Sequence, residues 1–460
     1  MTAGDDGALW SGRFSEPPAP EASALGRSLV FDIRLLDADV RASIAHVEAL
    51  RDAGLIPDDD ARTLTGALSE AGDALADPGA TFDPSDEDVH SALERSVTDR
   101  LGEPGARLHA GRSRNDLVVT DLRLWLLGEG QRIDTLTRAL ARALLERARE
   151  HTDTLMPGTT HGRPAQVVTL GHHLCAQAWA LTRDLERLTQ WSARSATSPL
   201  GAGALATTTL DLDAAATAGR LGFSRPFANS LDAVSDRDFV QEWIAVLAIL
   251  ATHLSRLAAD LARWTDPSLG WARIDEAYST GSSMMPQKRN ADTAELARAK
   301  AARVGAGFVS LTAVLQGLPL GYHRDLQEDK EPAFDAADTL TLVLPALTGA
   351  IRTLSFDADA MRAACEDEGL YATDLAEALV VAGVPFREAH RRTGELLRRL
   401  EDEGGSLRGL DADAWSAFGV PHGSSLLEPA RSVGARSGPG GPSPASVKAQ
   451  IDALDAALAT

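Results

Sequence analysis

A long helical seam is the feature of this sequence that most constrains its fold. From residue 243 onward, apolar residues recur at alternating steps of four and three: Trp243, Leu247, Leu250, Leu254, Leu257, Leu261 and Trp264. This spacing places them on one face of an α-helix, as in a helix packed lengthwise against another helix. Ser235 and Asp236 supply capping groups ahead of the seam, and Pro267 follows its end.

Other segments repeat the helical pattern. The segment 133–150 carries Leu136, Leu140 and Leu144 at helical spacing. Three further long helices are expected, at 165–195, 292–315 and 337–355. No region shows the alternating pattern of several consecutive strands, and aromatic residues make up only 5% of the chain, which favours helix over sheet.

The sequence therefore predicts an all-α fold in three domains. They are a mostly helical N-terminal domain (1–110), a central bundle of long helices (111–360) and a small helical C-terminal domain (361–460). A bundle with long apolar seams would be costly to expose to water on every side, so we expect oligomerisation.

Charge and composition limit the partners. The net charge is −21, so non-specific binding to nucleic acid or to an anionic membrane is not expected. The only cysteines, Cys175 and Cys365, cannot build a disulfide framework and fit a reducing cytosol. The N-terminus has no apolar signal core, and the longest strongly apolar run, 244–251, is shorter than the roughly 20 residues of a membrane span. We expect a soluble cytoplasmic protein. An anionic small molecule remains a possible ligand because a few arginines can reverse the potential inside one cleft.

Polar residues cluster in four segments that we expect to be loops joining helices. They are HAGRSRND (109–116), GTTHGRPAQ (158–166), GSSMMPQKRN (281–290) and GYHRDLQEDKEP (321–332). Arginines, serines, a lysine, a histidine and a tyrosine together suit the binding of a polyanionic small molecule and proton transfer on it. Such separate loops can converge only where helix ends or neighbouring subunits meet.

Metal and hydrolase chemistry fit the sequence poorly. His90 and Glu94 lie four residues apart on one helix face, but no HExxH or paired-cysteine motif is present, so we interpret them as a helix-face pair and expect no metal. No GxSxG elbow follows a strand, which argues against a Ser-His-Asp hydrolase.

The segment GSSMMPQKRN resembles the GSSxMPxKxN signature of the fumarase/aspartase superfamily. Within that superfamily the chain resembles the argininosuccinate lyase family. The segments that carry this resemblance follow one another along nearly the whole chain: WSGRF (10–14), 27–46, EDVHSALE (87–94), HAGRSRND, 317–335 and 372–390.

The resemblance implies a cofactor-free β-elimination within an elongated helical bundle. A base removes a proton from the carbon next to a carboxylate of a succinyl group. The charge is held as an aci-carboxylate, and the C–N bond breaks to release fumarate and an amine, which for this family is arginine, in the last step of arginine biosynthesis. Preorganised positive groups must stabilise the developing charge, because the C–H group is a poor acid.

The resemblance also assigns roles to residues. Ser282 would be the base, and His161, oriented by Glu295, would be the acid that assists departure of the amine. Lys288 and Asn290 would hold the carboxylate that takes up charge. The remaining residues would bind substrate: Ser28, Arg114, Asn115, Thr160, Tyr322, Gln327 and Lys330. Singly, each residue would more often be a cap, a turn residue or a solvated charge, and their joint occurrence in family order favours the functional interpretation.

The family further implies a homotetramer whose central helices pair into a multi-helix core and whose active sites are each shared between subunits. Two alternatives stay open. One is a related lyase that releases fumarate from a different N-succinyl amine in a specialised pathway. The other is a non-catalytic relative, as some lens crystallins are; the joint presence of Ser282, His161 and Lys288 argues against it.

Departures from the family pattern concentrate around His161. The family's usual G-Y-T-H-L-Q-x-A-Q-P reads GTTHGRPAQV here, and two smaller changes lie elsewhere. The replacing residues are Thr159, Gly162, Arg163 and Val167, with Leu117 for a glutamine and Ala291 for a proline. Arg163 adds a charge where the family has a neutral amide, and Gly162 frees the backbone, so these two are the possible specificity residues. We hypothesise that the succinyl half of the substrate is kept while the amine half differs from arginine.

Overall fold

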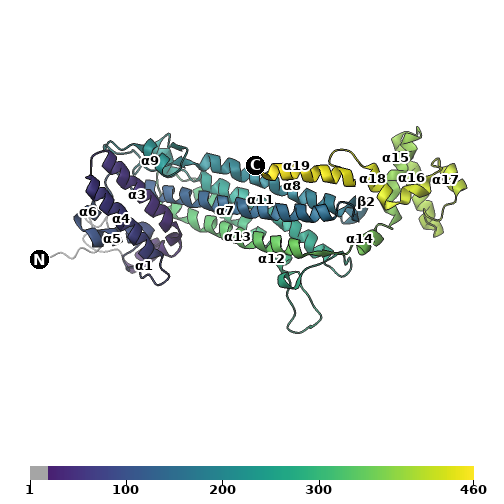
Figure 1. The fold of residues 1–460 in the computed structure, drawn as a ribbon, viewed down its shortest axis with the longest axis horizontal. Coiled ribbons are helices and arrows are strands. Elements are labelled where there is room, and N and C mark those ends of the chain that lie inside the picture. Colours follow the sequence, from purple (N-terminus) through teal and green to yellow (C-terminus); the bar gives the residue numbers. More distant parts are fainter. Residues whose placement is uncertain (1–18, 460) are drawn as a thin grey trace. The chain divides into compact units, whose positions relative to one another are not determined.

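The computed structural model describes residues 19–459, which are predominantly helical (Figure 1). The motif WSGRF at 10–14 lies outside the described residues. Contacts within the chain define two compact units, each treated by itself below. Unit 1 comprises Met1–Ile133, Arg187–Ala248 and Arg303–Thr339. Unit 2 comprises Asp134–Glu186, Ile249–Ala302 and Leu340–Thr460. The three-domain division expected from the sequence stays a prediction.

Long helices dominate the structure, as the sequence predicts. Those that contribute residues to both units are α7 (Arg114–Glu150), α8 (Leu170–Ser195), α11 (Asp238–Trp264), α12 (Asp292–Leu315) and α13 (Lys330–Thr353). All seven seam residues from Trp243 to Trp264 lie on α11, and each side chain is buried. Asp236 caps this helix, because its carboxylate accepts a hydrogen bond from the N–H of Asp238 at 2.7 Å.

Unit 1 also contains short helices and a small parallel strand pair. They are α1 (Pro20–Gly26), α2 (Leu29–Asp32), η2 (Ile33–Leu35), α3 (Leu36–Asp52), α4 (Asp58–Ala76), α5 (Val89–Leu101), α6 (Glu103–Ala106), β3 (Thr197–Ser198), α9 (Ala214–Arg220), β4 (Arg225–Pro226), α10 (Ser230–Ser235) and η4 (Arg324–Asp329). Helices α3, α4 and α5 pack side by side (Figure 1). The rings of Trp191 and Trp243 lie 4.7 Å apart, and Trp191 donates to the carbonyl of Phe239, so the α8 and α11 segments of this unit share a core.

Unit 2 adds a β-hairpin and a group of C-terminal helices. Its elements are β1 (Leu155–Thr160), β2 (Arg163–Thr169), β5 (Ala272–Arg273), η3 (Glu276–Tyr278), β6 (Ser355–Phe356), α14 (Ala358–Ala364), η5 (Glu368–Tyr371), α15 (Ala372–Val381), α16 (Phe386–Glu403), α17 (Ala412–Phe418), η6 (Gly423–Leu427), α18 (Pro429–Ala435) and α19 (Pro444–Ala459). Val167 of β2 packs in one buried cluster with Tyr371, Leu375 and Trp415, so the hairpin is fixed to the C-terminal helices.

The expected helices match the structure closely at 292–315 and less well at 165–195. The structure places residues 163–169 in strand β2 and begins α8 only at Leu170. Val167, Val168 and Thr169 are β-branched and favour a strand, and the Thr169 hydroxyl accepts from the N–H of His172, as at a helix start. The helix expected at 337–355 begins earlier, at Lys330, and ends at Thr353.

Two segments in the described part of the chain, Asp238–Trp264 and Arg324–Thr353, are long and apolar enough to cross a membrane. Core helices of soluble proteins pass the same test, and 50% and 61% of the most apolar stretches of these two are buried within the protein. The expectation of no membrane partner stays a prediction.

Candidate active site

The histidine segment forms a tight hairpin, where the sequence led us to expect a loop between helices. Strands β1 and β2 pair antiparallel with Thr160 opposite Arg163, so His161 and Gly162 alone form the turn. Both have positive φ, 53° and 73°, as in a type I′ hairpin turn. The carbonyl of Gly162 accepts a hydrogen bond from Arg263 of α11 at 3.3 Å. The turn therefore presents His161 to solvent from a defined backbone.

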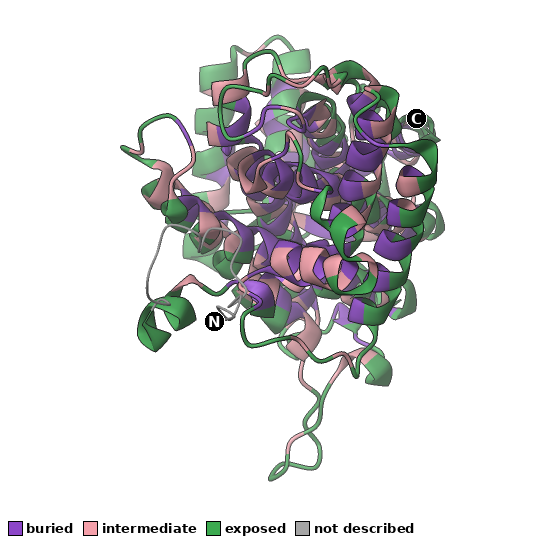
Figure 2. Ribbon diagram, turned by 90° about the vertical axis from the view of Figure 1, so that its left-hand side faces the viewer, coloured by how far each residue is buried: buried purple, intermediate pink, exposed green. Residues whose placement is uncertain are grey.

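The signature segment is a shaped loop that projects from unit 2 and is mostly exposed (Figures 1 and 2). Thr280 and Asn290 close its base through two backbone hydrogen bonds, of 3.3 and 2.8 Å. Inside it, the hydroxyl oxygen of Ser282 accepts from the N–H groups of Met284 and Met285 at 3.3 and 3.0 Å. The side chain of Lys288 is exposed on the same loop. The sequence prediction of a shaped loop is confirmed in its backbone, and the group that the loop would hold stays a prediction.

Within the described part of unit 2, no hydrogen bond or ion pair joins the side chains of Ser282, His161 and Glu295 to one another. Glu295 lies exposed in the first turn of α12, and its assigned role of orienting His161 stays a prediction.

A second group of predicted residues lies in unit 1, around the start of α5. The backbone N–H of Ser28 donates to the carbonyl of Glu87 at 2.9 Å, and its hydroxyl donates to buried Asp32 at 2.5 Å. Arg114, at the start of α7, pairs with Glu87 at 3.1 Å and Asp88 at 3.4 Å. Although burial lowers it, the charges of Asp88 and Glu87 raise the pKa of Arg114 above its ordinary value. Both side chains are thereby held in defined positions.

Asn115, next to Arg114, and the segment that contains Lys330 complete this group. Asn115 donates to the carbonyl of Ala204 at 3.0 Å. Lys330 is almost fully buried and donates to Asp329 at 2.9 Å. Tyr322 and Gln327 are partly buried in the same segment, and burial raises the pKa of Tyr322.

The sequence profile of the lyase family matches residues 12–306, and that of the argininosuccinate lyase C-terminal region matches residues 369–433. Argininosuccinate lyase of Acidothermus cellulolyticus is 46% identical over 98% of this chain and 94% of its own length. That of Frankia casuarinae is also 46% identical, over 97% of each chain. This chain belongs to the argininosuccinate lyase family. The solved structure of EDDS lyase in complex with formate matches with a TM-score of 0.85 and 28% identity over 97% of this chain and 91% of its own.

More distant structures of the superfamily share the fold. The class II fumarase of Schistosoma mansoni matches with a TM-score of 0.76 at 14% identity, over 86% of this chain and 90% of its own. The all-α fold of the fumarase/aspartase type is thus confirmed for this argininosuccinate lyase family member.

The prediction that His90 and Glu94 form a helix-face pair is wrong. His90 is buried and binds Asp39 at 2.6 Å, with Asp121 at 3.4 Å, whereas Glu94 lies near His109. Glu94 follows His90 by one turn, but His90 points toward α3 and α7, the elements of Asp39 and Asp121. The three side chains lie as close together as metal ligands would. Arg112, which donates to the Ser43 hydroxyl, adds a positive charge nearby, whereas burial and the charge of Asp39 raise the pKa of Asp121 well above its ordinary value.

This cluster predicts alkaline destabilisation. Burial lowers the pKa of His90, but the charge and hydrogen bond of Asp39 outweigh it and raise the pKa to about 9. Because the pKa of His90 is higher in the folded than in the unfolded protein, its protonation contributes roughly 3 kcal/mol of stability at most. This contribution is fully present below the pKa of the unfolded protein and is lost as the pH rises through about 9. We expect the melting temperature to fall between about pH 6.5 and 9 for wild type and much less for His90→Gln, whose stability is already lower at neutral pH. The exposed His422→Gln serves as control, and an equally steep alkaline decline in His90→Gln would refute this assignment.

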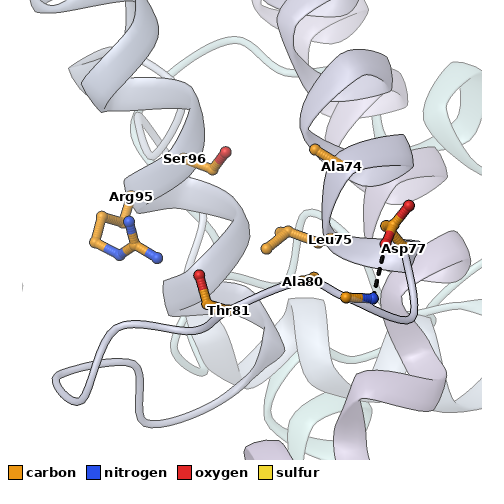
Figure 3. A pocket seen from close by; sticks show the side chains of 8 residues that line it. Ala74, Leu75, Asp77, Ala80, Thr81, Arg95 and Ser96 are labelled. Atoms are coloured by element: carbon orange, nitrogen blue, oxygen red, sulfur yellow. Dashed lines mark hydrogen bonds between the residues drawn. The ribbon is translucent and has the colours of Figure 1, made fainter.

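A separate hollow of about 430 Å³ lies between the end of α4 and α5 (Figure 3). Leu75, Asp77, Thr81 and Arg95 are among the residues that line it. Asp77 accepts from the N–H of Gly79 at 2.7 Å, and Arg95 pairs with Asp86 at 2.8 Å. The charged residues that line the hollow therefore already have partners, and no residue of the predicted site lines it.

Proposed function

We propose that this chain cleaves argininosuccinate to arginine and fumarate by β-elimination. The observation that carries the proposal is the 46% identity to argininosuccinate lyases over nearly the whole chain. The purified protein should release fumarate from argininosuccinate, measured by its ultraviolet absorbance, at a rate normal for a biosynthetic enzyme. Failure to do so at any protein concentration would rule the proposal out.

Ser282 acts as the base in this proposal. A serine hydroxyl is a weak base, and its alkoxide form needs hydrogen-bond donors and nearby positive charge. The N–H groups of Met284 and Met285 already point at the Ser282 oxygen at 3.3 and 3.0 Å, and Lys288 stands on the same loop. These donors favour the charged form of the oxygen, and they need no rearrangement when the proton moves.

The remaining groups stabilise the negative charge that develops on the substrate and protonate the leaving group. Lys288 and Asn290 hold the carboxylate that takes up negative charge after proton abstraction, and His161 delivers a proton to the departing nitrogen. Glu295 orients His161. Substrate binding is assigned to Thr160, next to His161 on β1, and to Ser28, Arg114, Asn115, Tyr322, Gln327 and Lys330.

The assembly that fits this proposal is a homotetramer with active sites shared between subunits. Large apolar side chains on the long helices are exposed in the single chain: Leu296 by 57%, Val309 by 66% and Leu342 by 65%. Apolar side chains repeated along helices suit the burial of those helices against other copies. Light scattering should give four times the chain mass, and a monomer would exclude sites built from several copies. Biosynthetic enzymes of this kind act in the cytoplasm, which is the location we propose.

A second candidate function keeps the succinyl half of the substrate and changes the amine. It is favoured by Arg163, an exposed cation next to His161, and by the 28% identity to EDDS lyase, a lyase with a different name in the same superfamily. A guanidinium at this place suits an amine half that carries its own carboxylate. In both functions the chemistry at Ser282 is the same.

The substitution Arg163→Gln separates the two functions. If Arg163 binds a carboxylate of the amine half, we expect kcat/KM for such N-succinyl amines to fall about tenfold or more relative to argininosuccinate. The assay compares argininosuccinate, adenylosuccinate, aspartate and N-succinyl amino acids, with the exposed Arg273→Gln as control. Wild-type turnover of argininosuccinate at a housekeeping rate, with no gain for the other substrates, would reject the second candidate.

A further inference from the structure

The segment that carries Tyr322, Gln327 and Lys330 is held at both ends by one short turn. This turn, Ser235–Arg237, lies between α10 and α11. At the near end, the N–H of Gly321 donates to the Ser235 hydroxyl at 2.6 Å, immediately before Tyr322. Gly321 has φ of +99°, so the chain changes direction at this contact.

At the far end, Arg237 donates through its Nε to one oxygen of Asp329, and Lys330 donates to the other oxygen at 2.9 Å. The side chains of Arg237 and Asp329 are each 1% exposed, and that of Lys330 is 5% exposed. Burying three charges is costly unless each is paired. Their sum is +1, because a single carboxylate lies between two cations.

The turn itself is fixed from behind. Arg123 of α7 donates to the carboxylate of Asp236 at 2.7 Å, and its guanidinium stacks 3.8 Å from the ring centre of Phe239. Arg237 also donates to the carbonyl of Asp236 at 2.8 Å. A turn anchored in this way can set the position of what it contacts.

We propose that the Ser235–Arg237 turn is a positioning element for the substrate-binding segment 321–330, and that Arg237 neutralises Asp329 so that the charge of Lys330 remains available to an anionic substrate. Without Arg237, the ammonium of Lys330 would be largely compensated by the carboxylate of Asp329, and the carboxyl group of Asp32, which also interacts with Lys330, would add to this effect. Arg237 shares Asp329 and leaves Lys330 with net attraction for a carboxylate. Arg237 thus acts on substrate only through Lys330. This inference rests on the proposed function, in which Lys330 binds substrate.

A double-mutant cycle tests it. We expect Arg237→Gln to raise KM for argininosuccinate about tenfold or more with a smaller change in kcat, as for loss of a charge-assisted contact. Arg237→Lys should recover part of this loss. In a Lys330→Met background, Arg237→Gln should change KM by less than about twofold, because the residue through which it acts is gone. Equal effects of Arg237→Gln in both backgrounds would overturn the inference.

A control separates positioning from general destabilisation. Arg436 pairs with Asp374 at 2.9 Å in unit 2, so Arg436→Gln should lower the melting temperature and leave KM unchanged. If Arg237→Gln fails to fold, Arg237→Lys and Ser235→Ala carry the same cycle, and unchanged KM in both would contradict the proposal. The same cycle can be measured as the affinity for fumarate by calorimetry, so it tests the inference even if the wild-type protein does not cleave argininosuccinate. Absence of cleavage would reject the proposed function and leave the inference to be decided by the fumarate affinities.

Discussion

Replacing Ser282 with alanine will lower kcat for fumarate release by about a thousandfold while the protein stays folded. Loss of a general base typically costs a factor of about a hundred to ten thousand. The Ser282 hydroxyl also accepts two backbone hydrogen bonds inside the signature loop, so its removal deletes the base and leaves these two donors without their acceptor. Steady-state absorbance kinetics and a melting curve of the same preparation measure the two quantities.

The neighbouring Ser283 supplies a matched control. It is exposed on the same loop and differs from Ser282 by one position, so Ser283→Ala should keep kcat within a few-fold of wild type if Ser282 alone is the base. Ser282→Thr keeps a hydroxyl and should retain measurable turnover, which separates loss of the base from loss of loop shape. If Ser283→Ala proves the more damaging substitution, the roles of the two serines are reversed.

The helices of this protein can be predicted from sequence because their signal is local and repeated. The spacing from Trp243 to Trp264 specifies one buried face, and all seven side chains are buried in the structure. The strand β2 could not be found in this way. Its pairing partner β1 supplies the hydrogen bonds, and a run of six or seven residues has no period long enough to distinguish strand from helix.

The site residues came from motifs, and a motif says nothing about their surroundings. The loop from Gly281 to Asn290 could be predicted as shaped, but the two N–H groups that point at Ser282 are visible only in the backbone. The positive φ of His161 likewise results from hairpin pairing between Thr160 and Arg163. This turn conformation explains why a glycine suits position 162. At φ of 73° it avoids the strain of about 1 kcal/mol that a leucine would meet there.

Residues that act through other residues escaped prediction altogether. Glu87 and Asp88 were part of a quoted motif, yet their pairing with Arg114 depends on how α5 meets α7. Arg237 belongs to no motif, and 92 residues separate it from Asp329 along the chain. Only the fold brings the two together. The sequence signal that could have drawn attention to Asp329 is its position directly before Lys330, since a carboxylate there must be compensated if the lysine is to attract an anion.

Replacing His161 with asparagine will lower kcat by about a hundredfold to ten thousandfold and leave the hairpin intact. Asparagine is the appropriate replacement because the residue has φ of 53°, a conformation that asparagine tolerates better than other side chains. The departing guanidine is strongly basic, so it leaves slowly without a proton donor. We expect imidazole added to the assay to restore part of the lost rate, since His161 is exposed at the turn and leaves a space open to solvent. The exposed His422→Asn should need no rescue and show none. A His161→Asn variant that retains most of the wild-type kcat would mean that another group, or water, protonates the leaving nitrogen, and the acid assigned here would have to be sought elsewhere in the assembled site.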